Sequence, residues 1–174
     1  MKLRAGLGDY VLRCVEPPVA GALTMHDLGE LFRRAGHQAG FVVESEYRVD
    51  TLEDGTAHHR KVDWVWLASG KRRDQIVVAF EIEGTGVPKP SLRCDLLKFS
   101  VLRARLNVIA LYQVNHDRRP FSCSSGVSTA VSAKVSEIRP QTKVRVVCDV
   151  DVFRKGGIEQ LMEDARKLAA TRRR

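Results

Sequence analysis

Two strand-like runs near the middle of the chain constrain its fold more than any other feature. Residues 61–67 and 76–83 are both rich in β-branched and aromatic side chains, which suit a pleated and half-buried surface. The connector between them, residues 68–75, is short and polar and contains a glycine, as hairpin connections do. The sequence therefore predicts two neighbouring antiparallel strands.

Acidic residues mark both of these strands. Asp63 lies in the first run, and Glu81 and Glu83 lie at the end of the second. Residues two apart in a strand point to the same face, so the two glutamates share one. If the register places Asp63 beside them, three carboxylates meet, and they repel one another unless protons or a cation compensate. Hard divalent cations such as Mg²⁺ prefer oxygen ligands of this kind.

The segments before these runs predict a helix and a further strand. Thr24 is a suitable N-cap for a helix over residues 25–35, with Asp27 three positions later, and Gly36 marks its end. Residues 41–49 alternate in a way that indicates a strand with one face in solvent. Three consecutive strands joined by short connections are typical of an antiparallel meander.

The second half of the chain predicts alternating helices and strands. Ser91 is a candidate N-cap for a helix that runs to about Leu106, and the apolar residues 108–114 follow as a buried strand. A strand, a helix and a strand in this order favour a parallel crossover. The remaining elements are a helix over 124–138, a strand over 144–150 and a last helix after Gly157. We therefore expect one α/β domain, residues 1–174, with a mixed central sheet flanked by helices.

The charge of the chain points to an anionic partner. Lys and Arg together number 29 against 21 for Asp and Glu, a formal net charge of +8, and nucleic acid is the usual partner of such a protein. Lys71, Arg72 and Arg73 lie in the connector between the two marked strands and are candidates for gripping phosphate. Taken alone, these three residues are more typical of an ordinary solvated turn.

Cysteine use and hydropathy indicate a cytoplasmic location. The chain has no long apolar run, so no membrane span is expected, and its first residues lack the apolar core of a secretory signal. Its four cysteines are scattered without paired spacing. We therefore expect them to be reduced packing residues of a cytoplasmic protein.

The order helix, three strands, helix, strand over about residues 23–114 resembles the common core of the restriction-endonuclease-like PD-(D/E)XK nucleases. That family has an Asp on the second core strand and an acidic-x-Lys motif on the third, and the matching residues here are Asp63 and Glu81-Ile82-Glu83. The resemblance implies an αβββαβ core, followed here by an αβα extension over residues 115–174.

One residue departs from the family pattern. Glu83 stands where the family usually has Lys. Some members that resemble this chain carry Glu at that place, and others move the lysine to the following helix, where Lys98 is the candidate here. The family's first helix often supplies one more acid, and Glu30 is the matching residue.

The resemblance implies a DNA endonuclease that hydrolyses phosphodiester bonds with Mg²⁺ or Mn²⁺. Asp63, Glu81 and the backbone carbonyl of Ile82 would hold the ion, and Glu30 or Glu46 on the neighbouring elements would be the further metal ligand for a second one. Glu83 or Lys98 would orient or deprotonate the attacking water. Because cutting both strands often takes two copies, a homodimer is also an expectation.

Other interpretations of the same residues stay open. Asp63 is also typical of a solvent-facing sheet residue paired with Lys61 or Arg60, and Glu81 with Glu83 of a charged strand edge that blocks aggregation. Glu83 in place of Lys favours a second hypothesis for function, a nuclease-fold module without activity that binds nucleic acid or a partner protein. A structural subunit of a larger assembly is the third.

Overall fold

The computed structural model describes residues 24–49, 61–68, 76–112, 126–139, 141–148 and 156–171. Along the chain their elements are α2 (Met25–Gln38), β1 (Val42–Arg48), β2 (Lys61–Leu67), β3 (Ile76–Gly84), α3 (Lys89–Leu102), β4 (Leu106–Tyr112), α4 (Val127–Ile138), β5 (Val144–Cys148) and α6 (Gly157–Ala170).

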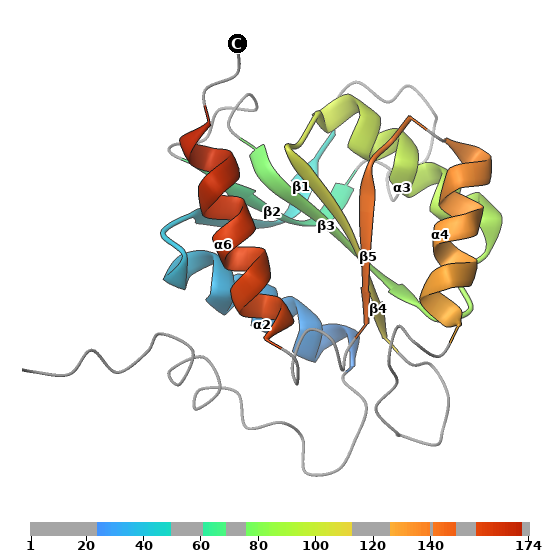
Figure 1. Ribbon diagram of the computed structural model, residues 1–174, viewed down its shortest axis with the longest axis horizontal. Helices are drawn as coiled ribbons and strands as arrows, with labels where there is room; N and C mark the ends of the chain where they lie inside the picture. Colours follow the sequence, from blue (N-terminus) through green and yellow to red (C-terminus); the bar gives the residue numbers. More distant parts are fainter. Residues whose placement is uncertain are drawn as a thin grey trace, which may run out of the picture.

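The five strands form one mixed sheet in the order β1-β2-β3-β4-β5. β1, β2 and β3 pair antiparallel, which confirms the expected meander. β3, β4 and β5 pair parallel, with α3 as the crossover from β3 to β4. The expected α/β class with a mixed sheet flanked by helices is therefore confirmed (Figure 1).

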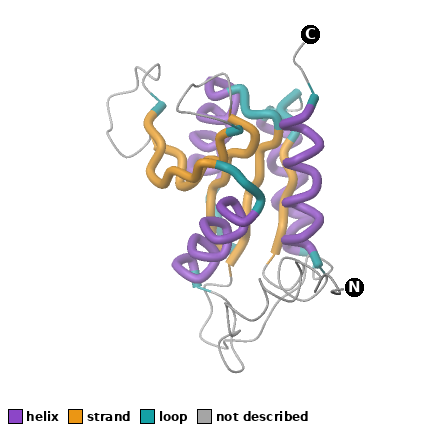
Figure 2. Tube along the Cα trace, turned by 90° about the vertical axis from the view of Figure 1, so that its left-hand side faces the viewer, coloured by secondary structure: helices purple, strands orange, loops and turns teal. Residues whose placement is uncertain are grey.

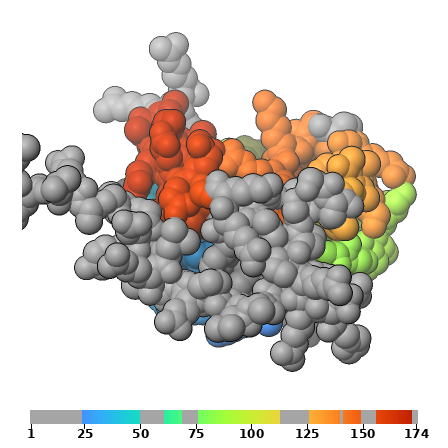
Figure 3. Space-filling view, turned by 60° about the horizontal axis from the view of Figure 1, so that its bottom comes forward, coloured from blue at the N-terminus to red at the C-terminus, as the bar shows by residue number. Residues whose placement is uncertain are grey.

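Helices cover both faces of the sheet, and each face has its own apolar core. One core combines α2 and α6 with residues such as Trp66, Phe80 and Val108. The other combines α3 and α4 with residues such as Ile109 and Leu111. Figure 2 shows the strands enclosed between the helices, and in the space-filling view of Figure 3 α6 and α4 lie at opposite sides of the molecule. Both sheet faces are therefore packed.

The start of α2 agrees with the prediction from the sequence, but its end does not. Thr24 and Asp27 form a full capping box. The helix continues through Gly36 to Gln38, so the expected end at Gly36 is wrong. A Cβ at Gly36 would lie 2.5 Å from both Trp66 Nε1 and a methyl group of Val43. Gly36 is small because the indole packs against the helix there, and it does not act as a C-cap.

Both ends of α3 also differ from the expectation. The helix begins after Pro88, which caps it without a side-chain hydrogen bond, so Ser91 is not its N-cap. Pro90 in the first turn has no N–H to satisfy and its φ is already helical, which allows this earlier start. The helix ends at Leu102 because Arg103 takes a left-handed conformation with φ 51°, which turns the chain into β4.

The alternation of β1 is broken at one position. Glu46 has φ 51°, a left-handed backbone that a non-glycine residue seldom adopts in a strand. Its neighbours keep the register with β2, Ser45 pairing with Trp64 and Tyr47 with Val62. The irregular residue therefore lies next to Asp63, at the site described below.

The structure bears on two expectations, the reduced state of the cysteines and the absence of a membrane-spanning helix. Cys148, at the end of β5, is disulfide-bonded, so the expectation that all four cysteines are reduced is wrong for this residue. Cys94 in α3 is free. Among the described helices, none is long and apolar enough to cross a membrane.

Candidate functional site

A cavity of about 350 Å³ opens where β2 and β3 meet the first turns of α3, and we call it the acid pocket. Its lining combines residues from β1, β2, β3 and α3 with one residue of α2: Met25, Glu46, Lys61, Asp63, Glu81, Ile82, Glu83, Ser91, Cys94, Asp95 and Lys98. The four candidate catalytic residues, Asp63, Glu81, Glu83 and Lys98, therefore line one cavity although up to 35 positions separate them in the sequence.

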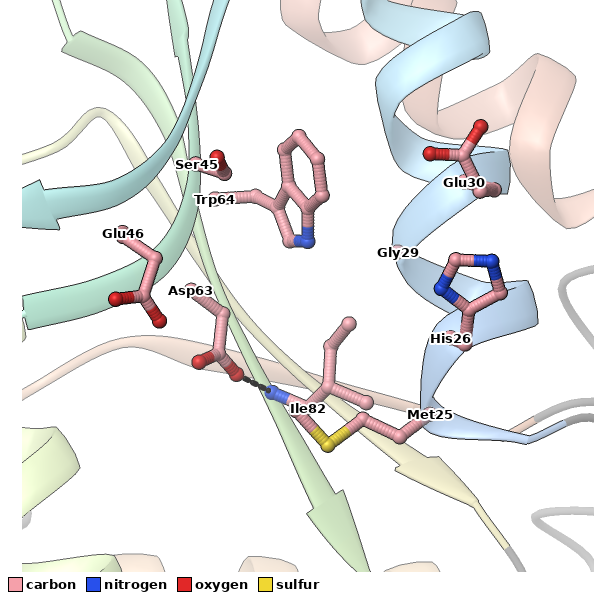
Figure 4. A pocket seen from close by; sticks show the side chains of 9 residues that line it. All are labelled: Met25, His26, Gly29, Glu30, Ser45, Glu46, Asp63, Trp64 and Ile82. Carbon is pink, nitrogen blue, oxygen red and sulfur yellow. Dashed lines mark hydrogen bonds between the residues drawn. The ribbon is translucent and has the colours of Figure 1, made fainter.

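Asp63 lies one residue beyond the last paired residues of β2 and β3. The pairing of β2 with β3 runs from Leu67 and Ile76 to Trp64 and Phe80. One residue further on, Asp63 Oδ2 accepts a 2.7 Å hydrogen bond from the backbone N–H of Ile82 (Figure 4). This bond fixes the carboxylate beside β3 and leaves its second oxygen for another partner.

Lys98 reaches into the pocket from α3. Its ammonium lies 2.5 Å from Glu81 Oε1 and 2.8 Å from Asp95 Oδ1. All three residues are buried, with exposed fractions of 3% for Glu81, 4% for Asp95 and 6% for Lys98. Burial alone would lower the pKa of Lys98, but the charges of Glu81 and Asp95 outweigh it and raise that pKa. The lysine is therefore charged and held in place.

Glu83 pairs with another carboxyl group. Burial, followed by the charge of Asp95 and a hydrogen bond between the two side chains, raises the pKa of Glu83 to about 8. Two ionised carboxylates cannot share a hydrogen bond because neither can donate. The contact therefore favours a proton on Glu83, donated toward Asp95, when no cation is present. A group with a pKa near neutral pH can both take up and release a proton under physiological conditions.

Two further carboxyl groups of the pocket, those of Glu81 and Asp63, also have raised pKa values. Burial raises the pKa of Glu81 well above its usual range, and the charge of Asp95 adds to this effect. Burial raises the pKa of Asp63 too, although the Ile82 N–H partly offsets it. Five acidic side chains line the pocket against the two ammoniums of Lys61 and Lys98, and Lys61 pairs with Glu46, so negative charge is in excess.

The donor chemistry of the acid pocket fits a hard divalent cation. Glu81 Oε1 and Asp95 Oδ2 are buried and make no hydrogen bond of acceptable geometry, although Glu81 Oε1 is within ion-pair distance of Lys98. Carboxylate oxygens of this kind are the ligands that Mg²⁺ and Mn²⁺ prefer. Over the described residues, no three His, Cys, Asp or Glu side chains form a ready-made metal-binding group. The ammonium of Lys98 occupies the position between Glu81 and Asp95 instead.

Glu30 lies apart from these groups. It lines a second cavity of about 400 Å³ that also contacts Asp63, and Figure 4 places the two carboxylates on opposite sides of it. Glu30 is paired with Arg33 at 2.8 Å and approaches Arg34 at 3.9 Å. Hydrogen bonds from Arg33 lower its pKa. The structure thus brings Asp63, Glu81 and Ile82 together and leaves Glu30 outside the acid pocket.

Sequence reasoning did not single out Asp95 as a site residue. Helical spacing places Asp95 and Lys98 on one stripe of α3, and this signal could have identified Asp95. Ser91 and Cys94 line the pocket as well, from the preceding turn. The candidate phosphate contacts Lys71, Arg72 and Arg73 lie outside the described residues.

No protein-family model, curated protein or solved structure matches this chain. Its function must therefore be argued from the acid pocket and the sheet that builds it.

Proposed function

We propose that the protein is a metal-dependent DNA endonuclease that hydrolyses phosphodiester bonds in the acid pocket. The observation that supports this best is the position of Lys98. A buried ammonium from α3 lies beside Glu81 from β3, in the same cavity as Asp63 from β2. Oxygen donors and a fixed cation in one cavity are what phosphoryl chemistry requires, because charge must be stabilised on the phosphate and water must be positioned.

Each residue has a defined task in this proposal. Asp63 and Glu81, with the backbone carbonyl of Ile82, would hold a Mg²⁺ or Mn²⁺ ion, which would supply charge stabilisation and an activated water. Asp63 is already oriented for this by its hydrogen bond to the Ile82 N–H. The charge of a bound cation would favour the ionised form of Glu83, which would then accept the proton of the attacking water, and Lys98 would stabilise the negative charge on the phosphate.

The arrangement of the elements also supports the proposal. The order α2, β1, β2, β3, α3, β4 is that of the core of the PD-(D/E)XK nucleases, which the sequence resembles. Asp63 lies on the second strand of that order and Glu81 on the third. Lys98 lies on the helix that follows, the place to which some members move the lysine.

DNA is the proposed partner because of charge. The net charge of +8 attracts a polyanion, while the acidic residues that line the acid pocket can be neutralised there by a cation. Lys71, Arg72 and Arg73 extend the proposed DNA contact from the connector between β2 and β3. A homodimer, for cutting both strands, remains part of the proposal.

A second candidate function is a nuclease-fold module that binds nucleic acid or a partner protein without cutting. The ion pairs of Lys98 with Glu81 and Asp95 favour it, because they neutralise much of the acidic charge without any metal. Glu83 at the usual place of a lysine favours it too.

Cleavage of supercoiled plasmid separates the two functions. The enzyme is expected to nick the plasmid with Mg²⁺ or Mn²⁺ and not with EDTA. Asp63→Asn and Glu81→Gln keep the size of the side chains and remove the metal ligands, so each should lower the rate by at least about 100-fold. Glu137→Gln, which changes an exposed carboxylate on α4, is the matched control and should cut like the unmodified chain.

Two results would overturn the nuclease proposal. Cutting that persists equally in Asp63→Asn would show that the activity belongs to a contaminant. Plasmid that stays intact with either metal, combined with salt-sensitive retardation on a gel, would favour the module.

A further inference from the structure

We propose that the cavity beside the acid pocket binds one unpaired nucleobase, so that the preferred substrate is single-stranded or locally unpaired DNA. This cavity, the Trp64 cavity, has a volume of about 400 Å³ and is lined by Met25, His26, Gly29, Glu30, Ser45, Glu46, Asp63, Trp64 and Ile82 (Figure 4). The inference rests on the proposed function because it assigns a substrate class to the same site.

The two cavities are neighbours with a common boundary. Four residues line both of them: Met25, Glu46, Asp63 and Ile82. A ligand that extends from one cavity into the other passes Asp63 and Ile82. A nucleotide has this form, because its phosphate and its base are adjacent groups joined by one sugar. A phosphate at the acid pocket therefore brings the base next to it within reach of the Trp64 cavity.

The lining of the Trp64 cavity selects the kind of group it can take. Trp64 and Ile82 supply half-buried and buried apolar surface, and Met25 is 49% exposed at the boundary. The carboxylates of Glu30 and Asp63 repel an anion, so a phosphate is excluded from this cavity. A flat and neutral group with apolar faces and polar edges is favoured, and a nucleobase is such a group.

Trp64 is held in position to receive a base. A Cβ at Gly29 would lie 3.0 Å from Trp64 Nε1, so the indole packs directly against the backbone of α2. On the other side Ser45 pairs with Trp64 across β1 and β2, which places its hydroxyl on the same face. In Figure 4 His26 and Ser45 lie at the edges of the cavity, where donors and acceptors can meet the edge of a base.

A paired base in a duplex cannot enter this cavity without first leaving the stack. Flipping a base costs unstacking and unpairing energy, and the cost is smallest for a base that is already unpaired. Stacking on an aromatic side chain does not depend on which base is present, because every base has a π-face. The Trp64 cavity therefore favours unpaired DNA over duplex and discriminates little between sequences.

Tryptophan fluorescence can test this directly, because the chain has only two tryptophans. Trp66 is fully buried and donates its indole N–H to the carbonyl of Phe32, so Trp64 is the one that a ligand can reach. The titration uses a mixed-sequence single-stranded 12-mer and its duplex with Ca²⁺, a hard cation that carboxylates bind, excited at 295 nm, and a gel of the titrated DNA checks that it stays uncut. The single strand should quench the emission and bind about 10-fold more tightly than the duplex.

Two variants keep the test independent of folding. Trp64→Leu removes the stacking surface and should weaken single-strand binding by about 10-fold, with duplex binding unchanged. Ser45→Phe fills the cavity from an exposed strand position, so the fold is retained and the preference for single strands should disappear. Circular dichroism melts confirm that both variants are folded. The mononucleotide dAMP, titrated in parallel, separates a free nucleotide as ligand from a base within a strand.

The outcomes are distinct from those of the plasmid assay. Quenching by the single strand without any plasmid cutting would keep this inference and remove the nuclease. Equal affinity for both DNA forms without quenching, or unchanged single-strand binding by folded Trp64→Leu, would overturn the inference and leave the nuclease untouched. Quenching by dAMP that the 12-mer does not reproduce would also overturn it, because the ligand would then be a free nucleotide.

Discussion

Both faces of the β2–β3 pair carry apolar core residues, but near the acid pocket the face toward α3 is acidic while the face toward α2 stays apolar. Toward α3 lie Asp63, Glu81 and Glu83, which are acidic and face the acid pocket. Toward α2 lie Trp66 and Phe80, fully buried and in contact with each other at a ring-centroid distance of 4.9 Å. Period-two alternation separates these sets, so one pair of strands supplies both a core and a site. Changes on one face should mainly affect stability, and changes on the other mainly chemistry.

The largest effect on stability is expected from the apolar face. Trp66→Ala removes a fully buried indole that stacks on Phe41 and donates a hydrogen bond to the Phe32 carbonyl. The free energy of unfolding should fall by about 4 kcal/mol, as measured by urea denaturation. A loss below about 1 kcal/mol would mean that this face is not the packed core described here.

The next largest effect tests whether the acid pocket also supports the fold. Lys98→Met removes the ammonium and leaves Glu81 and Asp95 buried without their partner. The free energy of unfolding should fall by about 3 kcal/mol at neutral pH, because an unpaired buried charge is costly. The loss should be smaller at pH 5, where the carboxyl groups are protonated more easily. A loss of the same size at both values of pH would contradict the ion pairs.

A smaller and pH-dependent effect is expected from Glu83. Its pKa of about 8 in the folded chain lies above the usual 4.5, so the folded state binds this proton more tightly than the unfolded state. Its contribution to stability is therefore present at low pH and is lost as pH rises from about 4.5 to about 8. Thermal melts in EDTA should show a smaller fall of melting temperature over this range for Glu83→Gln, whose amide can still donate to Asp95. An unchanged pH profile would contradict the shared proton.

The smallest effect on stability is expected from an exposed ion pair, which serves as the control for changes in the acid pocket. Glu137 on α4 is exposed and pairs with Lys89 at 2.7 Å. Exposed ion pairs contribute little because water and salt screen them. Glu137→Gln should leave the melting temperature and its pH dependence unchanged within error. A clear shift would mean that surface charge, and not the acid pocket, dominates the electrostatics of this chain.

Local patterns in the sequence predicted most of the fold. The richness of residues 61–67 in β-branched and aromatic side chains predicted β2 with the correct bounds, and the capping residues Thr24 and Asp27 predicted the start of α2. The errors arose where tertiary packing overrides a local signal. Gly36 reads as a helix end, but it is small to admit Trp66, and Ser91 reads as a cap, but it lines the acid pocket.

The candidate site was predictable only in part. Asp63 and Glu81 were identified because each lies in a strand-like run, a local signal, and because the order of the elements around them matches the resemblance. The partnership of Lys98 with Glu81 depends on how α3 crosses the sheet, which spacing alone could not fix. The contact between Asp95 and Glu83 also depends on how α3 crosses the sheet. The disulfide of Cys148 could not be predicted because the cysteines show no paired spacing.

Anomalous diffraction from crystals soaked in Mn²⁺ tests the central claim most directly. The account predicts one strong Mn²⁺ peak in the acid pocket, within bonding distance of carboxylate oxygens of both Asp63 and Glu81, and no peak in crystals of Asp63→Asn. A pocket without Mn²⁺ at millimolar concentration, with Lys98 still paired to Glu81 and Asp95, would contradict it.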